Sequence, residues 1–345
     1  MALADLGAKA LTLLPAETAH RVSLKALKAG LGPKLTGKAD PVLATSIAGM
    51  ELSHPVGLAA GYDKNGEAPD ALLAAGFAFV ELGAVTPRPQ AGNPQPRLFR
   101  LREDRAVINR MGFNNEGLDA LKARLEARAG KPGIVGINLG ANKDSEDRAG
   151  DYVLLVKALK GLASFFTVNI SSPNTPGLRD MQGAAALDDL LRRVNDARWT
   201  EPVFLKVAPD LDEAGIEAIT RAALDNRMSG LIVSNTTLAR PDTLKSRHRG
   251  EAGGLSGAPL TDMSNSVLRR FRQLAGTDLP LIGVGGINSV ESAYARIRSG
   301  ASALQLYTAL VYEGPGLVGR LRDGLAVRLK ADGYASLADA VGVDA

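Results

Sequence analysis

Apolar residues recur in eight short runs from residue 56 onward, and stretches with helical periodicity lie between them. The runs are VGLAA (56–60), FVEL (79–82), IVGIN (134–138), FTVNI (166–170), VFLKV (203–207), GLIVS (230–234), LIGV (281–284) and ALQL (303–306). Short strands that alternate with amphipathic helices predict βα units around a parallel sheet. Eight such units spread over about 250 residues match an α/β fold of the (β/α)8, or TIM-barrel, type. An open, doubly wound sheet is the alternative.

The N-terminal 40 residues carry a different pattern, which predicts two short helices as a small extension of the barrel. The first stretch, which Pro15 ends, has its apolar residues at helical spacing: Leu3, Leu6, Ala10, Leu13 and Leu14. The second places Leu24, Leu27 and Leu31 on one stripe, with Lys25 and Lys28 beside it. Neither stretch reaches the roughly 20 apolar residues of a membrane span. We expect 1–40 to lie on a membrane surface or to pack on its own protein, and 41–345 to form the barrel domain.

The net charge also differs between residues 1–40 and 41–345. The formal net charge is +4, and the first 40 residues, with six basic against three acidic side chains, account for +3 of it. A nearly neutral body argues against a nucleic-acid partner, which requires a broad basic face. The chain has no cysteine and three histidines, which excludes disulfides, thiolate metal sites and a cysteine nucleophile. We expect no metal.

In a barrel, the active site lies at the C-terminal ends of the strands. Polar residues gather at those positions: Gly61 to Asn65, Asn138, Asn169 to Asn174, Lys206, Ser234 to Thr237, Gly285–Gly286 and Tyr307–Thr308. Turn chemistry explains Ser171 to Asn174 well enough. It does not explain Lys206 inside the apolar run VFLKV, because a buried amine is costly unless it is paired.

Glycines near the last two strands indicate a phosphorylated ligand. GGLSG (253–257), GVGG (283–286) and the turn after ALQL supply backbone N–H groups where barrels commonly bind phosphate. Each motif alone is also typical of an ordinary turn. Together they favour a phosphate site, with Lys206 available for negative charge elsewhere on the ligand, such as that of a reduced flavin ring.

Longer motifs identify a family. In chain order they are AAGYDKNGE, GAVTPRPQAGNPQPRLFRL, INRMGFNNEGL, GINLGANK, NISSPNTPGLR, LKVAPDL, NTT, GGLSGAPL and GVGGINS. From about residue 41 to 330 they resemble the dihydroorotate dehydrogenases of the quinone-dependent, membrane-associated class (class 2). The resemblance implies oxidation of (S)-dihydroorotate to orotate in pyrimidine (UMP) synthesis, with one tightly bound FMN and a membrane quinone as acceptor. It also implies a monomer held peripherally on the cytoplasmic face of the cell membrane by its N-terminal helices.

The resemblance assigns the substrate site residue by residue. Ser172 is the base that takes the C5 proton, where the soluble classes carry cysteine, and Thr175 is a candidate partner on the proton route. Lys64 contacts the substrate carboxylate and the flavin. The other substrate positions are Asn109, Arg110, Met111, Gly112, Phe113, Asn169, Asn174, Asn235 and Thr236.

The same resemblance assigns the flavin and quinone positions. The flavin positions are Ala60, Gly61, Tyr62, Asp63, Lys64, Ala84, Asn138, Asn169, Lys206 and Ser234, with Gly257, Gly286, Tyr307 and Thr308 near the phosphate. Ala84 and Ser234 stand where many relatives carry a hydroxyl residue and threonine, respectively. His20, Arg100 and Tyr307 fall where the family lines its quinone tunnel, although His20 also fits an ordinary histidine on a surface helix.

Three other functions fit the sequence less well. A dihydrouridine synthase needs a catalytic cysteine and a basic RNA-binding face, and this chain has neither. A fumarate- or NAD-linked dihydroorotate oxidase lacks the N-terminal helices and uses cysteine as its base. A non-catalytic barrel that binds phosphorylated ligands does not need the set Lys64, Ser172 and Lys206.

Overall fold

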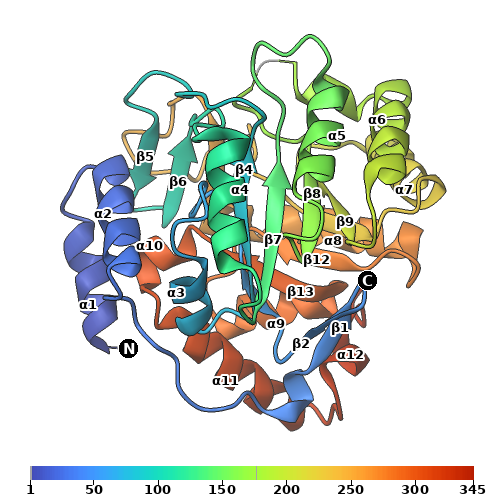
Figure 1. Cartoon of the computed structure of the whole chain (residues 1–345). Helices are drawn as coiled ribbons and strands as arrows, with labels where there is room; N and C mark the ends of the chain where they lie inside the picture. Colours follow the sequence, from blue (N-terminus) through green and yellow to red (C-terminus); the bar gives the residue numbers. More distant parts are fainter. Residues whose placement is uncertain (1, 176) are drawn as a thin grey trace.

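The barrel is closed and all of its strands are parallel. A computed structural model describes residues 2–175 and 177–345. The barrel strands, most of them labelled in Figure 1, are β3 (Val56–Leu58), β4 (Phe79–Val85), β7 (Ile134–Leu139), β8 (Phe165–Asn169), β9 (Val203–Val207), β10 (Gly230–Val233), β12 (Leu281–Val284) and β13 (Ala301–Leu306). Strand β13 pairs with β3, which closes the ring. The predicted fold is confirmed and the open-sheet alternative is wrong.

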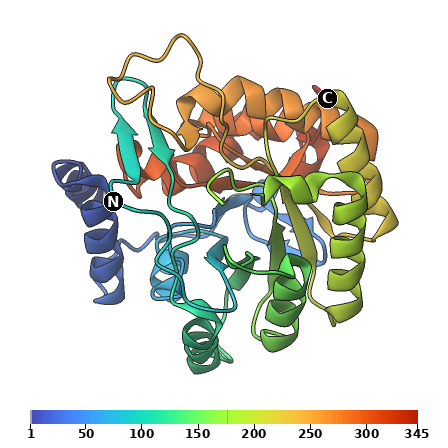
Figure 2. The same ribbon diagram turned by 90° about the horizontal axis from the view of Figure 1, so that it is seen from above.

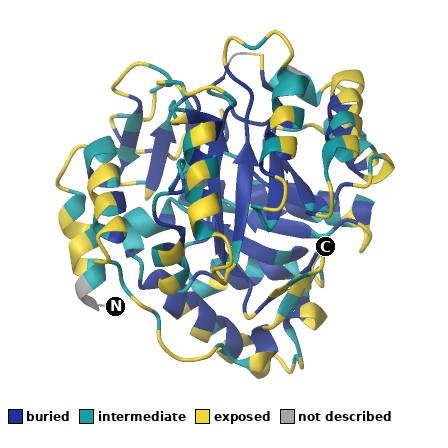
Figure 3. Cartoon of the chain, in the orientation of Figure 1, coloured by how far each residue is buried: buried dark blue, intermediate teal, exposed yellow. Residues whose placement is uncertain are grey.

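Helices surround the barrel. They are α3 (Pro69–Ala74), α4 (Gly117–Arg128), α5 (Arg148–Ala158), α6 (Ala184–Ala197), α7 (Glu213–Asp225), α8 (Thr261–Ala275), α9 (Val290–Arg298), α10 (Ala309–Glu313), α11 (Leu317–Ala331) and α12 (Leu337–Ala340). On α6, Leu187, Leu190, Leu191 and Val194 are fully buried, as their helical spacing predicts. The exposed residues of these helices face outward, whereas the strands are buried (Figure 3).

The barrel interior changes character along its axis. Near the N-terminal ends of the strands, Phe79, Phe165 and Phe204 pack edge to face, with ring centroids 6.2 Å and 5.5 Å apart. A hairpin of β1 (Thr45–Ile47) and β2 (Met50–Leu52) adds Ile47 and Leu52 to this cluster. Two residues further along, the same inward faces of β4 and β9 carry Glu81 and Lys206. The polar floor of the site is therefore the next inward layer above an aromatic core.

The two predicted N-terminal helices are present as α1 (Ala2–Leu11) and α2 (Ala16–Lys28). Seen from above, they stand outside the ring of helices on one side (Figure 2). Leu13 and Leu14 lie beyond the end of α1, and Leu31 lies beyond α2, so the helices are shorter than the leucine pattern predicts. Within the described residues, no helix combines the length and the apolar character needed to cross a bilayer.

An additional sheet beside these helices was not predicted. It consists of β5 (Leu98–Leu101), β6 (Ala106–Asn109) and β11 (Gly254–Gly257), all antiparallel, with β6 in the centre. Three single-turn 3-10 helices, η1 (Pro41–Leu43), η2 (Arg179–Gln182) and η3 (Ala258–Leu260), complete the fold. The sheet lies between α2 and the C-terminal ends of the barrel strands.

Candidate active site

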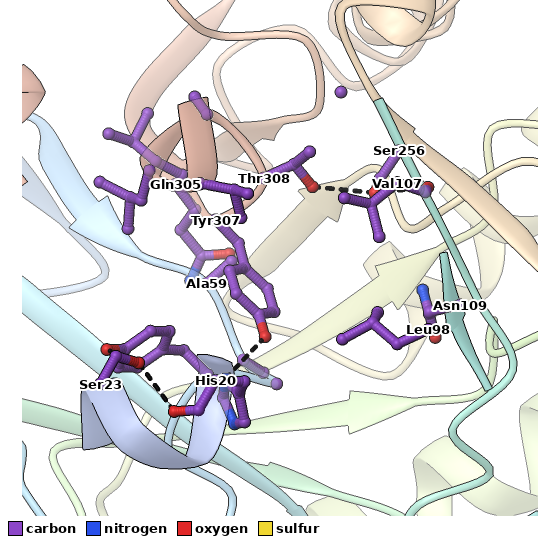
Figure 4. Close-up of a pocket in the computed structure, with 18 of the residues that line it drawn as sticks. His20, Ser23, Ala59, Leu98, Val107, Asn109, Ser256, Gln305, Tyr307 and Thr308 are labelled. Atoms are coloured by element: carbon purple, nitrogen blue, oxygen red, sulfur yellow. Dashed lines mark hydrogen bonds between the residues drawn. The ribbon is translucent and has the colours of Figure 1, made fainter. Parts of the chain in front are cut away.

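One cavity of about 870 Å³ runs from the space between α1 and α2 to the C-terminal ends of the barrel strands. Figure 4 shows part of its lining, where His20 and Ser23 lie near Tyr307. Its lining includes Ser172, Lys64 and Lys206, which come from different strand ends and lie far apart in the sequence. Every residue predicted for the substrate, flavin and quinone sites lines it except Asp63 and Arg110. The closed barrel therefore gathers the predicted residues around one space.

Asp63 and Arg110 support loops next to the cavity. The carboxylate of Asp63 accepts hydrogen bonds from the backbone N–H groups of Glu67 and Ala68, each 2.8 Å long, and burial raises the pKa of this carboxyl. The guanidinium of Arg110 pairs with Glu251 at 2.7 Å and lies over the ring of Phe99. Any contact of Arg110 with a ligand in the cavity must therefore come from its backbone.

Ser172 lies in the loop after β8 and is 7% exposed. The backbone N–H of Asn174 donates to its Oγ at 3.3 Å, and the side chain of Asn174 donates to Asn109 Oδ1 at 3.1 Å. The expected pairing with Thr175 is absent, because Thr175 Oγ1 is buried and has no hydrogen-bond partner among the described residues. The serine is thus held next to two amide side chains, with a donor at its oxygen.

Lys64 reaches the same region from the loop after β3. Its Nζ donates to Asn114 Oδ1 at 2.8 Å, and burial lowers its pKa to about 8. Asn114 was not among the predicted site residues, although it lies within the motif INRMGFNNEGL that pointed to the site. An ammonium held in a cavity by one neutral partner can still bind a carboxylate.

Amide side chains form a directed chain across the floor of the cavity. Asn235 donates to Asn169 at 3.3 Å, Asn169 donates to Asn138 at 2.9 Å, and Asn138 donates to Glu81 at 2.6 Å. Gln305 donates to the other oxygen of Glu81 at 2.5 Å. Because a carboxylate accepts and does not donate, Glu81 sets the direction of the chain. Glu81 was missed, although an acid inside the apolar run FVEL is the same kind of signal as Lys206 in VFLKV.

Lys206 projects from β9 into the cavity and is 5% exposed. Among the described residues its Nζ has no hydrogen-bond or ion-pair partner. Burial lowers its pKa, which the charge of Glu81 partly opposes. A buried amine without a partner suits a ligand with acceptor atoms and negative charge, as the ring of a reduced flavin has.

The far side of the cavity suits a phosphate. Gly257 and Gly286 have φ angles of +102° and +74°, and both line the cavity, as does Thr308, which hydrogen-bonds Ser256 at 2.8 Å. The N–H groups of Gly285 and Gly286 have no acceptor among the described residues. Unpaired backbone donors in a glycine-rich turn form an anion site. The donor set, a buried amine and unpaired backbone N–H groups, therefore fits a cofactor such as FMN, which has an acceptor-rich ring and a phosphate.

The outer end of the cavity is mostly apolar. The Nδ1 atom of His20, on α2, lies 3.4 Å from the hydroxyl of Tyr307. The His20 ring packs edge to face with Tyr62, and the Tyr62 hydroxyl donates to Ser23 Oγ. Burial lowers the pKa of His20 to about 4, so the ring is neutral at pH 7. Arg100, on β5, donates to the carbonyls of Thr12 and Leu14 at 2.5 Å and 2.7 Å. These hydrogen bonds attach the turn between α1 and α2 to β5.

Comparison with known proteins supports the resemblance. The family model for dihydroorotate dehydrogenase matches residues 42–329. The dihydroorotate dehydrogenase (quinone) of Parvibaculum lavamentivorans is 56% identical over 346 residues, which cover 100% of this chain and 99% of the relative. The protein of the same name from Novosphingobium aromaticivorans is 56% identical and covers 95% of this chain and 96% of its own.

Solved structures agree in fold. The ligand-free enzyme from Eimeria tenella superimposes with a TM-score of 0.92 at 38% identity, over 95% of this chain and 99% of that one. The same enzyme in complex with ferulenol gives a TM-score of 0.91 at 38% identity, over 95% of each chain. With a family model that spans most of its length and relatives that match nearly all of it, this chain belongs to the dihydroorotate dehydrogenase family.

Proposed function

We propose that the protein oxidises (S)-dihydroorotate to orotate in pyrimidine synthesis, with one FMN per chain and a membrane quinone as the final electron acceptor. The observation that carries this proposal is the single cavity, which has Ser172 and Lys64 at its polar end and the helix pair α1–α2 at its apolar end. A charged pyrimidine and an apolar quinone can thus both reach one flavin. The quinone-dependent relatives, similar along nearly the whole chain, support the choice of acceptor.

The residues at the polar end of the cavity bind the substrate and remove its proton. Lys64 pairs with the substrate carboxylate, and the amides of Asn109, Asn174 and Asn235 match the donors and acceptors of the pyrimidine ring. Ser172 Oγ takes the C5 proton, and the Asn174 N–H at 3.3 Å favours the deprotonated oxygen. When bound, FMN supplies the acceptor for the hydride from C6.

Two further groups act on the flavin. The amide chain that ends at Glu81 presents Asn138 and Asn169 to the cavity in one fixed orientation. Lys206 places a positive charge against the ring, which favours the negative charge of the reduced state in a cavity of low dielectric.

The N-terminal helices form the quinone entrance and the membrane contact. Leu6, Leu13 and Leu31 are 61%, 80% and 78% exposed on this side of the molecule. Lys25 and Lys34 are exposed nearby, and each basic residue near an anionic surface contributes about 1 kcal/mol. The protein therefore attaches peripherally to the cytoplasmic face of the membrane, and quinone passes His20, Arg100 and Tyr307 to reach the flavin.

Anaerobic reduction tests the proposal directly. The purified protein should be yellow and should be bleached by dihydroorotate, and the reduced protein is then mixed in parallel with quinone, fumarate or NAD. Fast reoxidation by quinone alone is the expected result. A colourless protein, a yellow protein that dihydroorotate does not bleach, or preferential reoxidation by fumarate or NAD would each overturn it.

A further inference from the structure

Arg296, on α9, is a buried arginine without a counterion. Its side chain is fully buried, and no carboxylate of the described residues lies within ion-pair distance of it. Burial lowers its pKa to about 9. A buried guanidinium that meets only neutral partners is costly, because neutral dipoles replace its hydration incompletely. A negatively charged group near the guanidinium would offset this cost.

The guanidinium contacts the turn after β12 and the start of α8. It donates to the carbonyls of Val284 and Gly285, at 2.7 Å each, to the carbonyl of Thr261 at 3.3 Å, and to Asn265 Oδ1 at 2.5 Å. All four acceptors are uncharged. The arginine therefore holds the glycine turn GVGG from behind.

These contacts determine where the turn points its donors. The peptide bonds that follow Val284 and Gly285 are trans, so in each plane the C=O and the next N–H point in opposite directions. With the two carbonyls directed at Arg296, the N–H groups of Gly285 and Gly286 point away from it. Both glycines line the cavity, and neither N–H has an acceptor among the described residues.

We propose that Arg296 is a positioning residue for the phosphate of FMN: it aims the N–H groups of Gly285 and Gly286 at that phosphate and supplies an uncompensated positive charge behind them. This inference rests on the proposed function, since it assumes that the cavity holds FMN. The phosphate dianion is the counterion that the described part of the chain does not supply. Arg296 consequently selects a phosphorylated flavin over riboflavin, which has the same ring and no phosphate.

The test compares the two flavins on the same protein. FMN is removed from the purified holoenzyme, and FMN and riboflavin are titrated back by flavin fluorescence. Arg296→Gln removes the charge and should lower the ratio of FMN affinity to riboflavin affinity by at least about tenfold. Riboflavin affinity should stay within about threefold, because its ring contacts are unchanged.

Arg298→Gln is the matched control. Arg298 lies on the same helix but points outward to Asp344 at 2.6 Å, so its loss should leave the ratio unchanged. If Arg296→Gln lowers the affinity for FMN and for riboflavin equally, Arg296 only braces the turn and the inference is wrong.

Asn265→Asp tests the charge without removing the arginine. Asn265 meets the guanidinium at Nε, so a carboxylate there should leave the hydrogen bonds of Arg296 to the turn in place. It supplies the missing counterion, and the preference for FMN should fall severalfold with no drop in the melting temperature. This variant decides the matter even if Arg296→Gln does not fold, and an unchanged ratio would refute the electrostatic role. An unmodified protein that is purified without FMN and does not take it up would instead overturn the proposed function.

Discussion

At the inner end of the cavity, Asn138, Asn169 and Lys206 project from buried strands and are at most 5% exposed. At the outer end, α1 and α2 leave Leu6 and Leu13 61% and 80% exposed, and hydrogen-bonding groups are few. The inner end is held by the barrel ladder and by side-chain hydrogen bonds that run to Glu81. The outer end consists of two short helices, which alone would be marginally stable and which the hydrogen bonds of Arg100 to Thr12 and Leu14 attach to the barrel domain.

The ion pair between Arg97 and Glu17 links the two ends. Arg97, next to β5, donates to Glu17 on α2 at 2.8 Å and 3.2 Å, and to the carbonyls of Ala91 and Asn93. This arginine lowers the pKa of Glu17. Asn93 in turn donates to the carbonyl of Asn174, which is next to the substrate residues. The difference between the ends suits two substrates of opposite polarity, and variants of each end should separate their half-reactions.

The largest effect should come from Ser172→Ala at the inner end. Loss of the base should slow flavin reduction by dihydroorotate by more than about 10⁴-fold, because no other base lies at this position. FMN content and reoxidation by quinone should not change, and Ser172→Cys should keep some activity. Stopped-flow reduction of the flavin measures the effect. Near-normal reduction in the Ala variant would remove Ser172 from the mechanism.

Deletion of residues 1–40 should have the opposite profile. Flavin reduction by dihydroorotate should persist, whereas turnover with a long-chain quinone, and its stimulation by vesicles, should collapse. Leu13→Ser is a milder variant of the same surface, and Leu154→Ser, at an exposed leucine on α5, is its control. Full turnover with long-chain quinone in the truncated protein would show that quinone enters elsewhere.

Lys206→Ala should act on the flavin rather than on either substrate. An amine against the ring stabilises the reduced state, so its loss should lower the reduction potential or weaken FMN binding by about 10- to 100-fold. Flavin content and a redox titration measure this. Lys160→Ala, an exposed lysine that lies over Trp199, serves as the comparison. An unchanged potential with unchanged FMN content would make Lys206 a structural residue.

The smallest effect is a pH dependence at Lys64. Its pKa is lowered to about 8, so the ammonium is present below that pH and is lost above it. The affinity of the oxidised holoenzyme for orotate should therefore be constant below pH 8 and should fall by up to about tenfold per unit above it. Lys64→Arg should abolish this transition, because guanidinium stays charged. A flat profile in the unmodified protein would exclude Lys64 as the carboxylate partner.

The predicted and unpredicted parts of the site differ in a physical way. Ser172, Lys64 and Lys206 could be named because each lies in a long motif or breaks an apolar run. Asn114 and Glu81 were missed, since their importance comes from the atoms they meet across the barrel. The expected contact between Thr175 and Ser172 rested on closeness in sequence, and among the described residues Thr175 Oγ1 has no hydrogen-bond partner.

The sequence by itself determined the barrel, the helix pair and the family, because side-chain periodicity and long motifs are local properties that need no partner to be recognised. Only the tertiary structure decided the sheet in which Ile108 pairs with Leu255, and the turn in which Arg296 holds Val284 and Gly285. Such contacts join segments that are distant in the chain. Their free energy depends on burial and geometry that arise once the barrel has closed.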